Sequence, residues 1–388
     1  MTSDTSTDFP LVLLIWGAGL GAAAQYGKVS VIFEDMATLY PDAGPSLGFT
    51  VSLVGFVGIL LGVTAGVLVG RVGFRPALIG GLIAGGLVSF YQAALPALPL
   101  FLVSRVLEGM SHLAIVVAAP TLISLVSSDR SRGFTLTLWG SFFGVAYTIL
   151  VLAGLPLVAG FGVPALFVAH GVYMLAFAAF LAVRLKADAP AANERLSLRA
   201  VLARHNTIYR SPFIAAPGIG WLFYTLTFVS TLTLIPPFID PAARVFVVGA
   251  MPLVSIAASL IIGVRLLTWF SPVAVMQIGF VGAAVTGIML AVVPGHPGLC
   301  ILLAGCFGLV QGAGFAAVPY LNTGAADRAQ ANGALAQTGN MGNTLGTPLL
   351  LGAIGVAGHT GFMAALAVIL SLGALSQWYL AVRRDASA

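Results

Sequence analysis

Long apolar segments fill nearly the whole chain and are separated only by short polar, proline-containing or glycine-containing stretches. A helix of about 20 apolar residues is long enough to cross a hydrocarbon core of ~30 Å. The pattern predicts twelve such helices, near residues 11–33, 49–70, 76–95, 99–126, 134–157, 163–183, 213–239, 245–268, 272–293, 298–322, 329–356 and 360–381. The expected fold class is therefore an all-α polytopic membrane protein.

The longest polar stretch, residues 184–212, has six predicted spans before it and six after it. We therefore expect an N-terminal six-helix bundle over 1–183, a cytoplasmic linker over 184–212 and a C-terminal six-helix bundle over 213–388. Within the linker, segment 195–205 places leucine and valine among arginines, which predicts a short amphipathic helix on the inner membrane surface. Similar polar and proline positions recur in the fourth and tenth spans, as an internal duplication giving two pseudo-symmetric bundles would produce.

Composition and charge support a membrane location and then orient the chain. Hydrophobic residues make up 59% of the sequence and charged residues only 7%, whereas about 25% are charged in an ordinary soluble domain. Cytoplasmic loops hold an excess of Lys and Arg, and one side of the predicted topology carries Arg71, Arg75, Arg130, Arg132, Arg184, Lys186, Arg195, Arg199, Arg204, Arg210, Arg265, Arg328, Arg383 and Arg384, against Arg244 alone on the other. Both termini are therefore expected in the cytoplasm, in a multi-pass inner-membrane protein whose net charge of +5 requires no nucleic acid partner.

Sequence signatures of common enzymes are incomplete or missing. The run Gly17-Ala-Gly19-Leu-Gly21 lacks the last glycine of a dinucleotide fingerprint, and the chain contains neither H-E-x-x-H nor G-x-S-x-G. Cys300 and Cys306 lie about 9 Å apart along one predicted helix and point to different sides, so no disulfide between them is expected. The sequence predicts a protein that is not an enzyme and uses no cofactor or metal ion.

Two short motifs resemble those of the major facilitator superfamily. The segment from Gly66 to Pro76 reads GVLVGRVGFRP, and its residues Gly66, Leu68, Arg71, Gly73 and Arg75 match the family's loop signature G-x-L-a-D-R-x-G-R-[KR]. The usual aspartate is Gly70 here, and one usual arginine is Phe74. In the fourth span, Arg105-x-x-Glu108-Gly109 resembles the family's R-x-x-Q-G element, with glutamate in place of glutamine.

The resemblance implies two six-helix bundles and secondary active transport by alternating access. It also implies that the loop carrying Gly66, Arg71, Gly73 and Arg75 takes part in conformational exchange, through a charge relay that steadies the outward-open state. The residues themselves indicate a simpler role as well. Glycines allow a tight turn and close helix approach, while arginines hold the loop at the cytoplasmic headgroups.

Three charged residues fall well inside predicted spans: Lys28 in the first, and Arg105 and Glu108 in the fourth. A charge in the bilayer interior costs about 2.5–3.5 kcal/mol, so such groups normally face a cavity and find partners. At 1.5 Å per residue the three share one depth, about 9 Å or more inside their helix ends. Arg105, Glu108 and His112 lie on one helix face, as do Gln25 and Lys28 on theirs. This face is expected to line the cavity.

Two cations against one carboxylate favour a substrate that carries an anionic group. Lys28 and Arg105 are therefore candidate substrate-binding residues, and Glu108 is the candidate proton carrier because burial and neighbouring cations act on its pKa in opposite directions. His112 is a second candidate for proton coupling. The alternative is that Arg105 and Glu108 form an intrahelical pair with a purely structural role.

Further candidate substrate-binding residues are neutral. Gln25 shares a face with Lys28, and aromatic residues of the first half can line an apolar or cation-attracting wall. The second half supplies tyrosine, glutamine and asparagine side chains that orient a substrate or, alternatively, only join helices through hydrogen bonds. The candidates are Gln25, Tyr26, Trp139, Tyr224, Gln311, Tyr320 and Asn340.

The function expected from the sequence is that of a monomeric secondary transporter. It moves a small organic solute, anionic or zwitterionic, by alternating access and is coupled to protons; its partners are the substrate, protons and the lipid bilayer. A proton-driven exporter of drugs or metal-chelating metabolites is the alternative, because Arg105-x-x-Glu108-Gly109 resembles an element common in such exporters. A non-transporting membrane sensor is a further alternative, against which the short loops argue.

Overall fold

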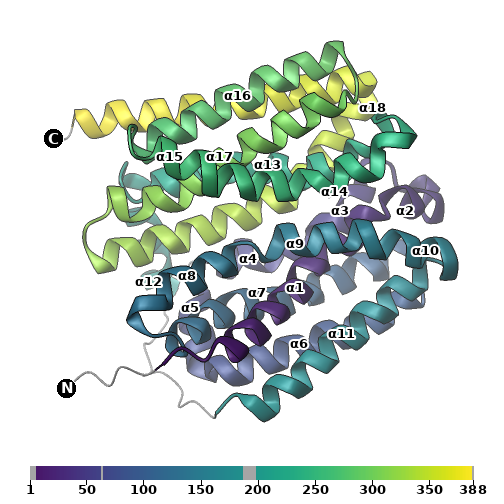
Figure 1. Ribbon diagram of the computed structural model, residues 1–388, viewed down its shortest axis with the longest axis horizontal. Coiled ribbons are helices and arrows are strands. Elements are labelled where there is room, and N and C mark those ends of the chain that lie inside the picture. Colours follow the sequence, from purple (N-terminus) through teal and green to yellow (C-terminus); the bar gives the residue numbers. More distant parts are fainter. Residues whose placement is uncertain (1–5, 63, 187–197, 387–388) are drawn as a thin grey trace. The chain divides into compact units, whose positions relative to one another are not determined.

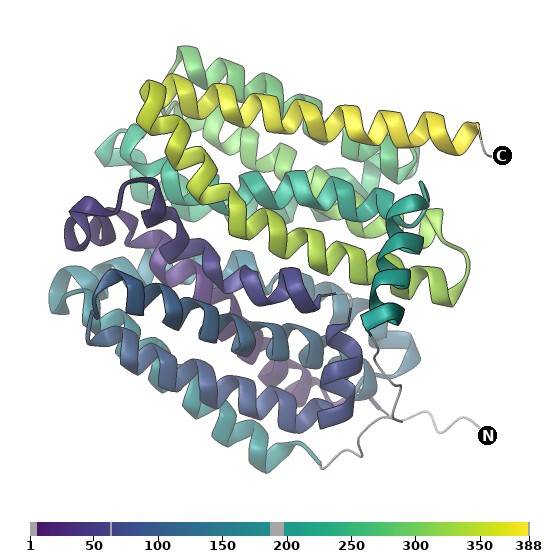
Figure 2. The same cartoon turned by 180° about the vertical axis from the view of Figure 1, so that it is seen from behind.

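The computed structural model describes residues 6–62, 64–186 and 198–386, which form helices joined by short turns (Figure 1). Within these residues, eleven helices are long and apolar enough to cross a membrane. The last of them lies in α18 (Ala325–Asp385), whose backbone leaves helical geometry at Ala357 and Gly358. Figure 2 shows the resulting change of direction between the yellow-green and yellow parts of α18. Counting both parts of α18 separately gives the predicted twelve spans, and the all-α membrane fold is confirmed.

Contacts divide the chain into two units. Unit 1 comprises Met1–Tyr40 with Thr64–Arg195, and unit 2 comprises Pro41–Val63 with Leu196–Ala388. The segment 41–63 thus belongs by its contacts to unit 2, although the chain enters and leaves it from unit 1. The sequence-based domain limits of 1–183 and 213–388 stay a prediction.

Unit 1 is built around four helices that pack on one another, α1, α6, α7 and α11 (Figure 1). Gly86 of α6 and Gly171 of α11 face each other so closely that a Cβ on either would lie 3.1 Å from the other's carbonyl oxygen. This allows the two backbones to approach, as small residues do in membrane helix pairs. The helices of unit 1 are α1 (Phe9–Val31), α2 (Phe33–Leu39), α5 (Ala65–Val72), α6 (Phe74–Ala93), α7 (Leu98–Leu125), α8 (Asp129–Gly140), α9 (Phe142–Ile149), a π-helical turn η3 (Leu150–Gly154), α10 (Leu155–Phe161) and α11 (Val163–Arg184).

In unit 2, α18 packs along α13 on a glycine-lined face. A Cβ on Gly346 would lie 2.2 Å from the carbonyl oxygen of Leu226, and one on Gly342 would lie 2.1 Å from Oγ1 of Thr225. The helices of unit 2 are η1 (Pro41–Leu47), α3 (Gly48–Ser52), η2 (Leu53–Gly55), α4 (Phe56–Leu61), α12 (Leu198–Arg210), α13 (Ala215–Leu234), η4 (Pro236–Phe238), α14 (Pro241–Ala257), a π-helical turn η5 (Ala258–Gly263), α15 (Val264–Leu266), α16 (Pro272–Val292), α17 (Pro297–Leu321) and α18.

The segment 41–61 also packs on α18. Gly48 lies against the backbone of Pro348, and Gly58 lies against the side chain of Asn340, where an added Cβ would be 2.2 Å from Cγ. The helical turns begin at Pro41, earlier than the predicted start near residue 49, because a 3₁₀ segment containing Gly44 at φ +53° extends the span on this side.

A helix is confirmed in the predicted linker, although Arg195 and Leu196 lie outside the described residues. It is α12, and it is joined to α18 by side-chain hydrogen bonds. The Tyr209 hydroxyl donates to Oε1 of Gln337 over 2.8 Å, and Nε2 of Gln337 lies 2.9 Å from Nε2 of His205. Burial raises the pKa of the Tyr209 phenol, so this donor stays protonated at neutral pH. Its position at the membrane surface stays a prediction.

Candidate functional site

The three intramembrane charges lie together inside unit 1. Nζ of Lys28, on α1, is 2.6 Å from Oε1 of Glu108, on α7. Arg105 forms an ion pair with Oε2 of Glu108 from one helical turn away. All three side chains have an exposed fraction of 0%. The predicted shared depth is therefore confirmed, and so is the intrahelical pair of Arg105 with Glu108.

The Lys28 ammonium has three hydrogens and meets three acceptors. Besides Glu108, these are Oγ of Ser89 on α6, at 2.9 Å, and Nδ1 of His170 on α11, at 3.2 Å. Ser89 donates its own hydrogen to the carbonyl of Phe167 over 2.9 Å. Four helices thus meet at one lysine, and the ammonium is fully coordinated by hydrogen-bond acceptors from three of them.

Glu108 is bonded at both carboxylate oxygens. Oε1 accepts from Lys28, while Oε2 accepts from Arg105 and from Nε2 of Gln92 over 2.9 Å. Nη2 of Arg105 also donates to the carbonyl of Gln25 over 2.5 Å. We call Lys28, Ser89, Arg105, Glu108 and His170 the charged cluster. Its two cations and one carboxylate leave a net charge of +1 in a space closed by α1, α6, α7 and α11.

The other candidates of unit 1 surround the charged cluster. Nε2 of Gln25 donates to Oγ of Ser111 over 2.8 Å. Tyr26 meets the ring of His112 edge to face, with centroids 5.1 Å apart, and Nδ1 of His112 is 3.1 Å from the carbonyl of Ala22. Since a carbonyl only accepts, His112 carries its hydrogen on Nδ1. His112 is therefore anchored to the backbone of α1.

Aromatic stacking holds two further candidates. Trp139 stacks on Phe142 with centroids 4.5 Å apart, and it fills the space beside Gly19. In unit 2, Tyr224 is buried and lies with its ring centroid 4.7 Å from that of Trp221 and 5.2 Å from that of Phe228. Both side chains are part of apolar packing within their own units.

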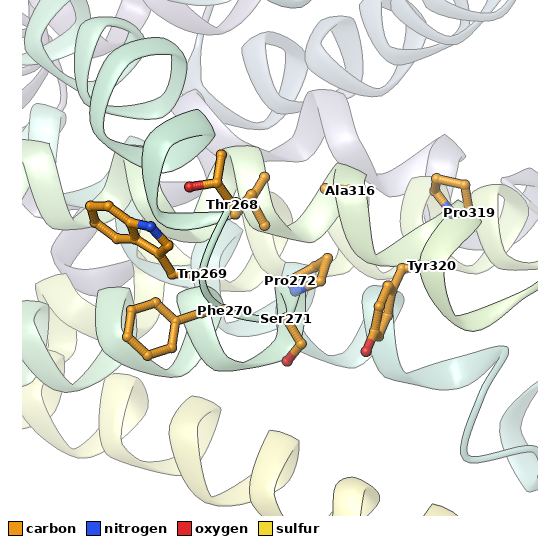
Figure 3. A pocket seen from close by; sticks show the side chains of 9 residues that line it. Thr268, Trp269, Phe270, Ser271, Pro272, Ala316, Pro319 and Tyr320 are labelled. Carbon is orange, nitrogen blue, oxygen red and sulfur yellow. The ribbon is translucent and has the colours of Figure 1, made fainter.

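The remaining candidates of unit 2 differ in exposure. Gln311 is half-buried on α17, and Asn340 donates to the carbonyl of Ala336 over 2.8 Å. Tyr320 is exposed and lines an open hollow of about 580 Å³ with residues 267–272, Ala316 and Pro319. Figure 3 shows Trp269 and Phe270 on one side of this hollow and Tyr320 on the other. The structure therefore gives the four candidates of unit 2 different surroundings and different partners.

No metal centre is formed within the described ranges 6–62, 64–186 and 198–386, where no three His, Cys, Asp or Glu side chains are suitably grouped. Cys300 and Cys306 are both free thiols.

Comparison of the sequence with protein families decides the identity. The model of the family described as "Major Facilitator Superfamily" matches residues 11–246, which is more than half of the chain. This chain belongs to the Major Facilitator Superfamily. It is thus a multi-pass membrane protein and a secondary transporter of a small molecule, not an enzyme. No curated protein matches the sequence closely enough to be named as a relative.

In this major facilitator the loop motif forms the turn between α5 and α6. Gly73 has φ +96°, a conformation that side chains with a Cβ rarely adopt, whereas a Cβ on Gly66 would meet open space. Arg75 donates from Nε to the carbonyl of Leu185 over 2.9 Å and from Nη2 to that of Ala182 over 2.8 Å. These are carbonyls at the C-terminal end of α11, where a cation is favourable. The motif thus joins α6 to α11 in unit 1.

Sequence reasoning missed the neutral side chains that form hydrogen bonds with the charged residues of the transporter. Ser89 and Gln92 lie one turn apart on α6 and both face the cluster, and His170 interrupts the apolar sequence of α11. The i, i+3 spacing of Ser89 and Gln92 and the polar residue in the sixth span were the available signals. Neither signal says which partner these side chains meet.

Proposed function

We propose that this major facilitator carries a small organic anion or zwitterion across the cytoplasmic membrane by alternating access, in exchange or together with protons. The observation that carries the proposal is the net positive charge of the charged cluster, in which Lys28 and Arg105 share Glu108 at zero exposure. A buried charge that is not fully compensated raises the free energy of the folded protein. Charged residues of this kind in membrane spans normally mark a substrate or ion pathway. An anionic substrate group supplies the missing negative charge.

The hydrogen bonds of Glu108 support the proposed proton coupling. Both carboxylate oxygens accept from cations, so the ionised form satisfies the hydrogen bonds of Lys28 and Arg105. Adding a proton to the charged cluster weakens the attraction of the cluster for Lys28 or Arg105. Conversely, when one of these cations moves away, the cluster binds a proton more easily. Proton binding and anion binding are therefore linked through the same ionic contacts, with Glu108 as the coupling carboxylate.

The remaining candidates have supporting roles in the proposal. Gln25 and Arg105 are linked through the Gln25 carbonyl, so a substrate that engages the cluster also acts on α1. The other residues proposed to contact substrate are Tyr26, Trp139, Tyr224, Gln311, Tyr320 and Asn340. His112, with its backbone anchor at Ala22, is proposed only as a second proton-binding group.

We propose that both termini face the cytoplasm, on the basis of the asymmetric loop cations. Single cysteines at Asp42 and Thr268, both exposed, should report this in a background lacking Cys300 and Cys306. An impermeant thiol reagent applied to intact cells should label the cysteine at position 42, and should label the cysteine at 268 only after lysis. Labelling of position 268 in intact cells would reverse the orientation.

The substrate class can be tested in proteoliposomes by recording transport currents on a solid-supported membrane. A panel of monocarboxylates, dicarboxylates and amino acids is compared with lipophilic cations, at two pH values. We expect currents with some of the anions or zwitterions, a pH dependence of these currents, and at least a tenfold loss of affinity in Lys28→Gln. Arg265→Gln is the matched control, since Arg265 is exposed and lies over Trp269 at 4.6 Å.

The opposite pattern would overturn the proposal. Currents with lipophilic cations alone, unaffected by Lys28→Gln, would favour the exporter of drugs instead. Anion currents of wild-type size in Lys28→Gln would remove the charged cluster from substrate binding.

A further inference from the structure

His170 is held in a single hydrogen-bonding state by its neighbours. Its Nε2 is 3.0 Å from the carbonyl of Gly21, which can only accept, so Nε2 carries a hydrogen. Its Nδ1 is 3.2 Å from the Lys28 ammonium and 3.0 Å from Oγ of Ser89, whose hydrogen is used on Phe167. Nδ1 therefore presents a lone pair to Lys28, and the imidazole is neutral.

The environment of His170 contains both charge signs. The charged groups acting on it are Lys28 from α1 and Glu108 and Arg105 from α7. The third neighbour, α6, supplies the Ser89 hydroxyl, and α10 (Leu155–Phe161) has no titratable side chain. Of these charged groups, Lys28 is the one in direct contact with Nδ1, so the position of the ammonium decides whether this nitrogen can bind a proton.

A second positive charge at Nδ1 would face the ammonium at 3.2 Å, with no solvent between them. Like charges at such a distance in a low-dielectric interior repel strongly. If the ammonium moves towards an anion, Nδ1 loses its donor, and a proton bound there is stabilised by Glu108, which keeps Arg105 and Gln92 on its other oxygen. The move also breaks the hydrogen bonds of the ammonium to Glu108 and Ser89, and the protonated Nδ1 then donates to Oγ of Ser89 in place of Lys28.

We propose that Lys28 and His170 form a proton-exchange switch, in which an anion that draws Lys28 away allows His170 to take up one proton at Nδ1. This inference rests on the proposed function for the anion, and it names the group on which the coupled proton resides. By linkage, protonation of His170 strengthens anion binding by the same factor by which the anion strengthens proton binding. In this switch Glu108, the coupling carboxylate of the proposed function, serves as counterion to whichever of the two bases is charged.

The switch can be tested without any substrate, with the proton as probe. Protein labelled with ¹⁵N-histidine is reconstituted in lipid nanodiscs, and His170 is assigned by the signal missing in His170→Gln. In the wild type we expect a neutral ring with its hydrogen on Nε2 at pH 7. In Lys28→Met the titration midpoint of His170 should rise by about one pH unit or more, since a charge in contact has been removed.

His112 provides the internal control, because it lies in the same unit but is bonded to Ala22, and its midpoint should move much less. Arg265→Met is the matched charge-removal control and should leave His170 unchanged. A hydrogen on Nδ1 of His170 in the wild-type protein would overturn the switch. This measurement does not depend on whether any variant folds. An unchanged His170 midpoint in a folded Lys28→Met protein would overturn the switch as well.

Transport then separates the switch from the proposed function. His170→Gln keeps a neutral acceptor towards Lys28 but cannot bind the proton, so it should still exchange carboxylates across the membrane while losing their accumulation by a pH gradient. Wild-type proton movement per carboxylate in His170→Gln would overturn the switch. Failure of the wild type to move any carboxylate would overturn the proposed function, whatever the histidine titration shows.

Discussion

Glu108→Gln should lower the stability of the folded protein more than any other single change in the charged cluster. The substitution leaves Lys28 and Arg105 buried together without a carboxylate, whereas the wild type places Glu108 between them. Removing one partner of a buried ion pair typically costs about 3–5 kcal/mol because the other charge is left uncompensated. The expected results are a markedly lower thermal unfolding midpoint in detergent and a lower yield of monodisperse protein.

Lys28→Met is the matched comparison, since it leaves Arg105 and Glu108 as a neutral pair. Its midpoint should lie close to that of the wild type, and Lys28→Met combined with Glu108→Gln should recover part of the loss seen in Glu108→Gln. Because the residues touch, the two effects should not add. A Glu108→Gln protein as stable as the wild type would show that Glu108 is not the shared counterion of the two cations.

Gly346→Val should lower the stability of the folded protein by disturbing the contact between α18 and α13. A Cβ at this position would lie 2.2 Å from the carbonyl oxygen of Leu226 and 2.5 Å from Oγ of Ser230, so α18 and α13 would have to move apart. Overpacking a well-filled interface costs about 1–3 kcal/mol or more when backbone must shift. Thermal denaturation of the purified protein should show a clear decrease in stability.

Gly352→Val provides the control on the same helix, because a Cβ at Gly352 meets no atom within 4 Å. A substitution that meets no neighbouring atom and leaves no buried group unpaired should change stability by about 0.5 kcal/mol or less. Equal effects of the two substitutions would mean that helix propensity, rather than contact between α18 and α13, determines the outcome.

Much of the fold could be predicted because the bilayer imposes a simple length rule on each span. The predicted end of the eleventh span at residue 356 agrees with the non-helical backbone at Ala357 and Gly358. The rule says nothing of irregular turns within a span. The pattern therefore leaves residues 41–47 outside the predicted spans, although the glycine and proline residues of this 3₁₀ segment are compatible with a continuing, irregular helix.

The charged half of the site could be predicted for a different reason. Lysine, arginine and glutamate are rare in apolar spans, so Lys28, Arg105 and Glu108 stand out, and helical spacing places the last two on one face. Serine, glutamine and neutral histidine carry no charge, so they stand out less among the apolar residues of a span. That Ser89 and His170 coordinate Lys28 depends on how α6 and α11 rotate against α1, which packing decides and a single sequence does not reveal.

The membership of residues 41–63 in unit 2 has a consequence for dissecting the protein. The polypeptide passes from one unit to the other three times, after Tyr40, after Val63 and after Arg195, and not only through the long polar linker. A truncated gene product that stops in the linker therefore contains a helix whose packing partner, α18, is missing. Its Gly48 and Gly58 surfaces, which meet Pro348 and Asn340 in the full chain, are left bare. The two halves of the sequence on either side of the linker thus do not coincide with the two packed units of the protein. Fragments intended to fold alone cannot be cut at the linker.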